Sequence, residues 1–169
     1  MSKTEIIIFS KNRTLQLKSL LTSIRHCSDI LEDQITVLYT SEPDIPYDQL
    51  IDEFHCTFVL QEAFLDDVKR IVDNADSSYI CFMVDDLIFR DLFSLRGIES
   101  FMDHNGDMDC FSLRLGRNIQ DGKEPEFSSR DGNIIVWDTS EALGTTWKYF
   151  WEISGSIYRK DLVSKYLRK

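Results

Sequence analysis

The sequence predicts an α/β protein of three layers, α/β/α, in which helices cover both faces of a mostly parallel central sheet. Strand-like and helix-like segments alternate through the first hundred residues, which is typical of such a sheet. The most apolar segment, residues 79–84 (YICFMV), has the continuous hydrophobic pattern of a strand buried on both faces. No repeat, low-complexity segment or linker interrupts the 169 residues, so we expect a single domain over residues 1–169.

The elements of the first half follow one another regularly. A β-branched run predicts a strand over residues 5–10, and apolar residues at helical spacing predict a helix from Thr14, a candidate N-cap, to about residue 27. The pattern then predicts a strand at 35–40, a short helix at 47–53, a strand at 56–60, a helix at 66–74 and the central strand at 79–84.

The second half is less regular and richer in tryptophan. We expect a helix over residues 92–102 and a strand over 109–115, followed by a polar loop over 118–133. Short strands at 134–137 and 153–158 and a final helix from Lys160 complete the prediction.

The charge of the chain restricts its partners. Nineteen basic and 29 acidic residues give a formal net charge of −10. Binding to nucleic acid or to an anionic membrane requires clustered Lys and Arg, so we expect neither partner. The phosphates of a small nucleotide ligand would need a metal ion or a few local cations.

Cysteine spacing and hydropathy indicate a cytoplasmic protein. None of the four cysteines lies in a CxxC pair, which favours buried reduced thiols over a zinc site. The amino terminus passes directly into a strand-like run, so we expect no signal peptide. The longest apolar runs, of about five residues, are far shorter than the roughly 20 needed to span a bilayer, so we expect no transmembrane segment.

Two adjacent carboxylates, Asp85 and Asp86, follow the most apolar strand. In open α/β sheets, ligands bind outside the carboxyl ends of the strands. A cation between the carboxylates and a ligand would offset their mutual repulsion, and oxygen ligands at so few positions suit Mg²⁺ or Mn²⁺. A solvated turn or a helix cap is the alternative interpretation of this pair.

Polar residues also follow the first strand, at the same predicted edge of the sheet. Lys11, Asn12 and Arg13 place cations and an amide there, and the amino terminus of the next helix adds its positive dipole. These groups suit a nucleobase or phosphate. The alternative interpretation is a solvated loop position for Lys11 and a surface ion pair for Arg13.

Three segments together, FSKNRTLQLKSLLTSI, ITVLYTSE and YICFMVDDLIF, resemble the A-type-fold nucleotide-sugar glycosyltransferases of the family-two-like group. The resemblance covers roughly residues 4–95. It implies the nucleotide-diphospho-sugar transferase fold, with a sugar-donor half over about 1–95 and an acceptor half over about 96–169. It also implies metal-dependent transfer of a sugar from a UDP- or GDP-linked donor to a hydroxyl acceptor such as a glycan, with inversion.

The same resemblance implies roles for individual residues. Asn12 and Arg13 would approach the nucleotide, and Glu42 would substitute for the acidic residue that the family places after the second strand. Asp85 would face the ribose or base and share the metal with Asp86, the principal ligand of Mn²⁺ or Mg²⁺.

The acceptor half offers a candidate base within an aromatic cluster, which consists of Trp147, Tyr149, Phe150 and Trp151. Aromatic rings stack on sugars and also build cores, and both interpretations stay open. Inverting transfer needs a base to take the acceptor proton. Glu152 is preferred over Asp138 because it lies among the aromatic residues. Arg114 and Arg117 either offset diphosphate charge or pair with surface acids.

Two other classes of protein are alternatives. A nucleotidyltransferase shares the general architecture, but it normally carries a Gly-rich loop after the first strand, and FSKNRT contains no glycine. A non-catalytic nucleotide- or carbohydrate-binding module on the same fold is the second alternative.

Overall fold

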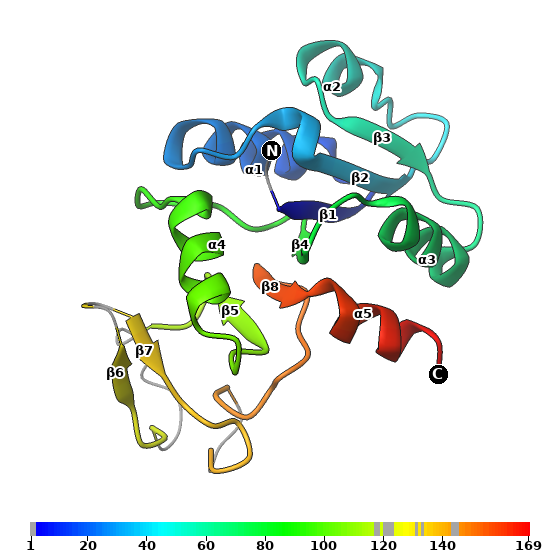
Figure 1. Ribbon diagram of the computed structural model, residues 1–169. Helices are drawn as coiled ribbons and strands as arrows, with labels where there is room; N and C mark the ends of the chain where they lie inside the picture. Colours follow the sequence, from blue (N-terminus) through cyan, green and yellow to red (C-terminus); the bar gives the residue numbers. More distant parts are fainter. Residues whose placement is uncertain (1–2, 117–118, 120–123, 131, 133, 143–145) are drawn as a thin grey trace.

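A six-stranded sheet forms the centre of the protein, with strand order β3-β2-β1-β4-β8-β5 (Figure 1). The computed structural model describes residues 3–116, 119, 124–130, 132, 134–142 and 146–169. The elements are β1 (Thr4–Lys11), α1 (Thr14–Cys27), η1 (Glu32–Gln34), β2 (Ile35–Thr40), α2 (Asp48–Glu53), β3 (Thr57–Leu60), α3 (Phe64–Asn74), β4 (Tyr79–Val84), α4 (Leu95–His104), β5 (Cys110–Ser112), β6 (Ser128–Arg130), β7 (Ile134–Val136), β8 (Ser156–Arg159) and α5 (Lys160–Leu167).

The sheet is mostly parallel, as predicted. β1 pairs in parallel with both β2 and β4, and β2 pairs in parallel with β3. The exception is β8, which lies between β4 and β5 and is antiparallel to both. β5 therefore runs in the same direction as β4, although the two strands do not touch in the sheet.

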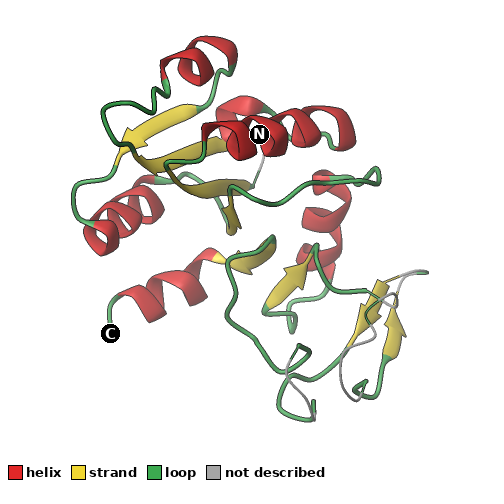
Figure 2. Ribbon diagram, turned by 180° about the vertical axis from the view of Figure 1, so that it is seen from behind, coloured by secondary structure: helices red, strands yellow, loops and turns green. Residues whose placement is uncertain are grey.

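Helices cover both faces, which confirms the three-layer architecture. Alternate residues of β1 point to opposite faces, so Ile6 and Ile8 belong to one core and Ile7 to the other. Apolar residues of α1, α2 and α4 pack in the first core, and those of α3 and α5 pack in the second. The two helix layers are visible on opposite sides of the sheet in Figures 1 and 2.

The predicted elements of the first half are confirmed to within a few residues, with one correction. Thr14 is the first residue of α1, and Arg13 occupies the N-cap position, so Thr14 is not the cap. The chain reaches this position from Asn12, whose left-handed backbone (φ 56°) turns it out of β1 and into the helix.

The second half differs more from its prediction. The strand expected over 109–115 is only Cys110–Ser112. Part of the loop expected over 118–133 lies outside the described residues, and part of it forms β6. β6 pairs with β7 in a separate two-stranded sheet, so the strand expected over 134–137 lies outside the central sheet, beyond β5 (Figure 2).

Aromatic packing holds this β6–β7 hairpin to the rest of the chain. Trp147 is fully buried, and its ring meets Phe127 and Trp137 edge to face, with ring centroids 5.2 Å apart in both pairs. Trp147 therefore belongs to the core. Tyr149 and Trp151 of the predicted aromatic cluster remain partly exposed, with 65% and 39% of their surface accessible.

All four cysteines are free thiols in the structure, as predicted, but Cys81 alone is fully buried and the other three are partly buried. Burial raises the pKa of both Cys56 and Cys110 to about 12. Across the described segments, every helix is too short or too polar to traverse a bilayer.

Candidate functional site

The carboxyl ends of β1 and β4 lie side by side, and the polar segments that follow them form one cleft. The two strands are in parallel register to Phe9 and Val84, and the N–H of Asp85 continues the pairing by donating to the carbonyl of Phe9 at 3.2 Å. A cleft of about 380 Å³ opens at this point, which we call the strand-end cleft. It is lined by Phe9, Ser10, Lys11, Arg13, Leu38, Thr40, Gln61, Val84, Asp85 and Asp86.

Asp85 is buried, with 4% of its surface exposed, and its carboxylate fixes the turn after β1. Its Oδ2 accepts hydrogen bonds from Ser10 Oγ at 2.8 Å and from the N–H of Lys11 at 3.3 Å. The Arg13 guanidinium lies 3.5 Å from Oδ1. A buried carboxylate needs such partners to offset its desolvation.

Tyr47 extends this network. The hydroxyl of Ser10 has a single proton and donates it to Asp85, so Tyr47 donates to Ser10 Oγ across 2.8 Å. The Tyr47 hydroxyl in turn accepts from the N–H of Arg13 at 3.3 Å. The chain of hydrogen bonds therefore runs from Arg13 through Tyr47 and Ser10 to Asp85. Sequence reasoning missed Tyr47 because an aromatic residue beside a short helix carries no signal of such a role.

Asp86 differs sharply from its neighbour. Its side chain is 57% exposed, and its Oδ2 lies 3.2 Å from the same Arg13 nitrogen that faces Asp85. Arg13 thus offsets the repulsion between the two carboxylates. The side chain of Arg13 is itself 51% exposed, so it can also meet a ligand in the cleft.

A divalent cation fits this site through Asp86. No three His, Cys, Asp or Glu side chains of the described residues come together as a metal cage. Mg²⁺ usually needs only one or two carboxylates and takes its other ligands from water and substrate phosphates. The exposed carboxylate of Asp86 meets that requirement, whereas that of Asp85 is already engaged by Ser10 and Lys11.

Asn12 and Glu42, both candidates for nucleotide binding, contact each other. Asn12 Nδ2 donates to Glu42 Oε1, and the N–H of Glu42 donates to Asn12 Oδ1, both at 2.9 Å. The N–H of Asn12 also donates to the carbonyl of Thr40 at 3.1 Å. These bonds tie the end of β1 to the end of β2 beside the strand-end cleft. Direct contact of Asn12 or Glu42 with a nucleotide stays a prediction.

Two further residues, at the ends of β2 and β3, line the strand-end cleft. Thr40 ends β2, and Gln61 follows β3 and donates its N–H to the carbonyl of Tyr39 at 2.8 Å. The buried hydroxyl of Thr40 has no hydrogen-bond partner among the described residues. Thr40 and Gln61 therefore bring polar side chains to the wall opposite Asp85.

Glu152 lies beside β8, on the side of β4 that faces away from β1. Its Oε2 accepts from Arg114 Nε at 2.8 Å, its Oε1 accepts from Ser156 Oγ, and only 12% of its side chain is exposed. The structure brings Arg114 to Glu152 and brings neither residue into the lining of the strand-end cleft. Arg117 lies outside the described residues.

Asp138, the alternative base, is exposed and accepts hydrogen bonds from the N–H and the hydroxyl of Ser140, both at 2.7 Å.

Gly155, directly before β8, links β4 to the segment that follows β5. Its N–H donates to Phe82 of β4 and its carbonyl accepts from Leu113, both at 2.9 Å.

Solved structures with the same fold come from Staphylococcus aureus TarS, a glycosyltransferase. TarS residues 1–349 match at a TM-score of 0.59 with 16% identity, over 97% of this chain and 49% of that one. The same segment in complex with UDP matches at 0.61 with 14% identity, over 97% and 48%. Its complex with UDP-GlcNAc matches at 0.59 with 16% identity, over 97% and 47%.

The chain has the A-type glycosyltransferase fold. It spans about half the length of these TarS structures. No protein-family model matches the sequence, and no curated protein matches it. The fold implied by the sequence resemblance is therefore confirmed, and at this identity the likeness extends to the fold alone.

Proposed function

We propose that the chain binds a UDP- or GDP-linked sugar in the strand-end cleft and transfers the sugar, with inversion, to a hydroxyl acceptor such as a glycan. The observation that carries the proposal is the convergence of Arg13, Asp85 and Asp86 at the carboxyl ends of two parallel strands. Structures of the same fold in complex with UDP and UDP-GlcNAc support it.

The charges of the cleft suit a diphosphate in spite of the acidic chain. Lys11 and Arg13 line the cleft, and α1, which begins at Thr14, points its positive end toward the same edge. In this proposal Arg13 contacts the diphosphate and Asp85 holds the turn that positions Arg13. Asp85 would also face the ribose.

Asp86 is the proposed ligand of Mn²⁺ or Mg²⁺. A bound divalent cation would act as a Lewis acid on the departing diphosphate. Arg13 contacts Asp86 in the structure, so Arg13 and a bound cation would compete for one carboxylate. Arg13 is half exposed, so its guanidinium would be free to turn toward the phosphates if Asp86 held a metal ion.

Glu152 is the proposed base for the acceptor hydroxyl. Both of its carboxylate oxygens are engaged, by Arg114 and Ser156, and a base must release such contacts to accept a proton. This observation favours a second candidate function, in which the chain binds the nucleotide sugar without turning it over.

Calorimetric titration with UDP and GDP, in Mn²⁺ and then in EDTA, tests the sugar-donor site. We expect metal-dependent binding that Asp86→Ala removes and that Asp33→Ala, a change at the opposite end of the sheet, leaves intact. If the folded protein binds neither nucleotide with or without metal, the proposed site is wrong.

Release of UDP from UDP-GlcNAc distinguishes the two candidate functions. If Glu152→Gln binds UDP normally but loses the release activity of the unaltered protein, Glu152 acts in transfer. If the unaltered protein binds UDP and releases none from UDP-GlcNAc with any saccharide tested, the binding function is the correct one.

A further inference from the structure

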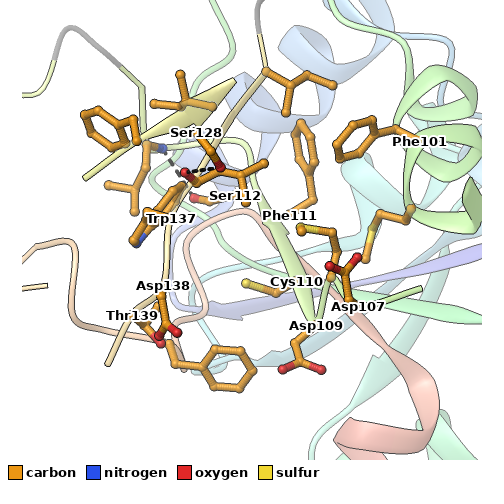
Figure 3. A pocket seen from close by; sticks show the side chains of 18 of the residues that line it. Phe101, Asp107, Asp109, Cys110, Phe111, Ser112, Ser128, Trp137, Asp138 and Thr139 are labelled. Atoms are coloured by element: carbon orange, nitrogen blue, oxygen red, sulfur yellow. Dashed lines mark hydrogen bonds between the residues drawn. The ribbon is translucent and has the colours of Figure 1, made fainter. Parts of the chain in front are cut away.

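A second, larger cavity of about 730 Å³ lies between the outer edge of the central sheet and the β6–β7 hairpin (Figure 3). We call it the hairpin cavity. Its walls come from the end of α4, from β5 and the residues that precede it, and from β7 and the residues that follow it. The volume lies within the range of small-molecule sites, which is roughly 300–1,000 Å³.

Aromatic rings form the walls of the hairpin cavity. Phe101 of α4 and Phe111 of β5 meet edge to face with centroids 6.2 Å apart, and Trp137 lines the cavity from the hairpin side (Figure 3). The indole N–H of Trp137 donates to the carbonyl of Trp147 at 3.0 Å. Trp137 therefore contributes an apolar ring surface to the cavity.

The polar groups of the cavity are carboxylates and hydroxyls. Five acidic residues line it, and all five are exposed: Asp107, Asp109, Glu126, Asp138 and Glu141. Ser112, Ser128 and Thr139 add hydroxyls. Lys, Arg and His are absent from the described lining residues.

The described part of this lining disfavours anions. A phosphate or carboxylate in the cavity would meet several negative charges and no cation of the described lining, whereas the strand-end cleft offers Lys11 and Arg13. The two cavities therefore select opposite kinds of ligand. Aromatic rings can stack against the C–H face of a sugar ring, and carboxylate and hydroxyl oxygens accept hydrogen bonds from its hydroxyl groups.

We propose that the hairpin cavity binds an uncharged saccharide. Leu113, directly after β5 and next to the cavity residue Ser112, lies 3.6 Å from the position of a Cβ at Gly155, and Leu87, next to Asp86, lies 4.0 Å from the same position. The segment after β4, next to the strand-end cleft, and the segment after β5, next to the hairpin cavity, thus both approach Gly155. The role of the hairpin cavity as the acceptor site rests on the proposed function, but saccharide binding itself does not.

Ligand-detected NMR and calorimetry with three uncharged trisaccharides, maltotriose, cellotriose and triacetylchitotriose, test this inference. We expect at least one to bind, with affinity unchanged by saturating UDP. Replacing Asp109 and Glu126 together by lysine removes hydrogen-bond acceptors and reverses the charge of the lining. We expect this double variant to lose about tenfold or more in affinity and to gain binding of the anionic trigalacturonate.

The matched control is a second double variant, Asp33→Lys with Asp52→Lys, which changes the net charge equally on acidic residues outside the cavity. It should retain saccharide binding and should not bind trigalacturonate. The gain of a new ligand cannot result from loss of folding, so it separates the proposed role from a structural one.

Other outcomes overturn either the inference or the proposed function, and they separate the two. If no uncharged trisaccharide binds although UDP does, the hairpin cavity is not a saccharide site, and the proposed sugar-donor site still stands. If only the cationic glucosamine trimer binds, the cavity selects amines. If a trisaccharide binds but neither nucleotide does, the proposed function fails while the saccharide site remains.

Discussion

Replacing Asp85 by alanine should destabilise the protein far more than the same change at Asp86, although the two residues are adjacent and chemically identical. Asp85 is 4% exposed and accepts hydrogen bonds from Ser10 and Lys11, whereas the side chain of Asp86 is 57% exposed and forms an ion pair with the half-exposed Arg13. The difference in burial therefore predicts a difference in the free energy of unfolding.

The magnitude follows from the contacts that each change removes. Asp85→Ala leaves the Lys11 N–H and the Ser10 hydroxyl without their acceptor, and hydrogen bonds to charged groups contribute about 1.5–3 kcal/mol each. The ion pair with half-exposed Arg13 adds little because solvent screens it. We expect a loss of about 3 kcal/mol for Asp85→Ala and less than about 1 kcal/mol for Asp86→Ala.

Urea unfolding at pH 7, followed by tryptophan fluorescence and circular dichroism, measures both values. Tyr47→Phe serves as an intermediate case, because it removes the hydroxyl that donates to Ser10 but keeps the carboxylate. Equal losses for the two aspartate variants would refute the buried network. So would a loss for Asp85→Ala smaller than that for Tyr47→Phe.

Three further predictions concern other parts of the chain. Backbone N–H groups of Glu62 and Ala63 hold the pKa of Asp67 below its usual value, so its contribution to stability is present above about pH 4 and lost as the pH falls through the lowered pKa. The urea midpoints of Asp67→Asn and the unaltered protein should therefore converge as the pH falls through this lowered pKa, and a constant gap would contradict this. Cys110, with its pKa raised to about 12, should react with iodoacetamide at pH 8 only after unfolding, as mass spectrometry can verify. Trp147→Ala should cost about 3–5 kcal/mol in urea unfolding, and a change below about 1 kcal/mol would mean that the ring is not core.

The sequence was most informative where strands are buried on both faces. β1, β2 and β4 are six to eight residues long and rich in apolar and β-branched residues, and the helices between them have apolar residues at helical spacing. β5, β6 and β7 have three residues each, and β6 is the polar run Ser-Ser-Arg. Such short segments become strands through their partners, and no local pattern identifies those partners. The antiparallel position of β8 also depends on tertiary pairing alone.

The candidate site was predictable in position but not in its internal arrangement. Strands that end at one edge of a sheet bring Arg13 toward Asp85 and Asp86, and this convergence follows from the order of elements. Burial of one carboxylate and exposure of the other depends on how the turn after β1 packs against β4. The two hydrogen bonds between Asn12 and Glu42 also could not be predicted from the sequence, because each residue, taken alone, was suited to contact a ligand.

The place of β8 sets a condition on folding during synthesis. Strands β3, β2, β1 and β4 leave the ribosome first and can pair with one another, but the apolar strand Tyr79–Val84 then has an unpaired edge. β5 pairs only with β8 in the central sheet of the described chain, so it cannot join until β8 has been translated. Unpaired apolar edges promote association between chains, and pairing of such distant segments is slow. The strong negative charge of the chain opposes that association through repulsion between molecules until β8 closes the edge.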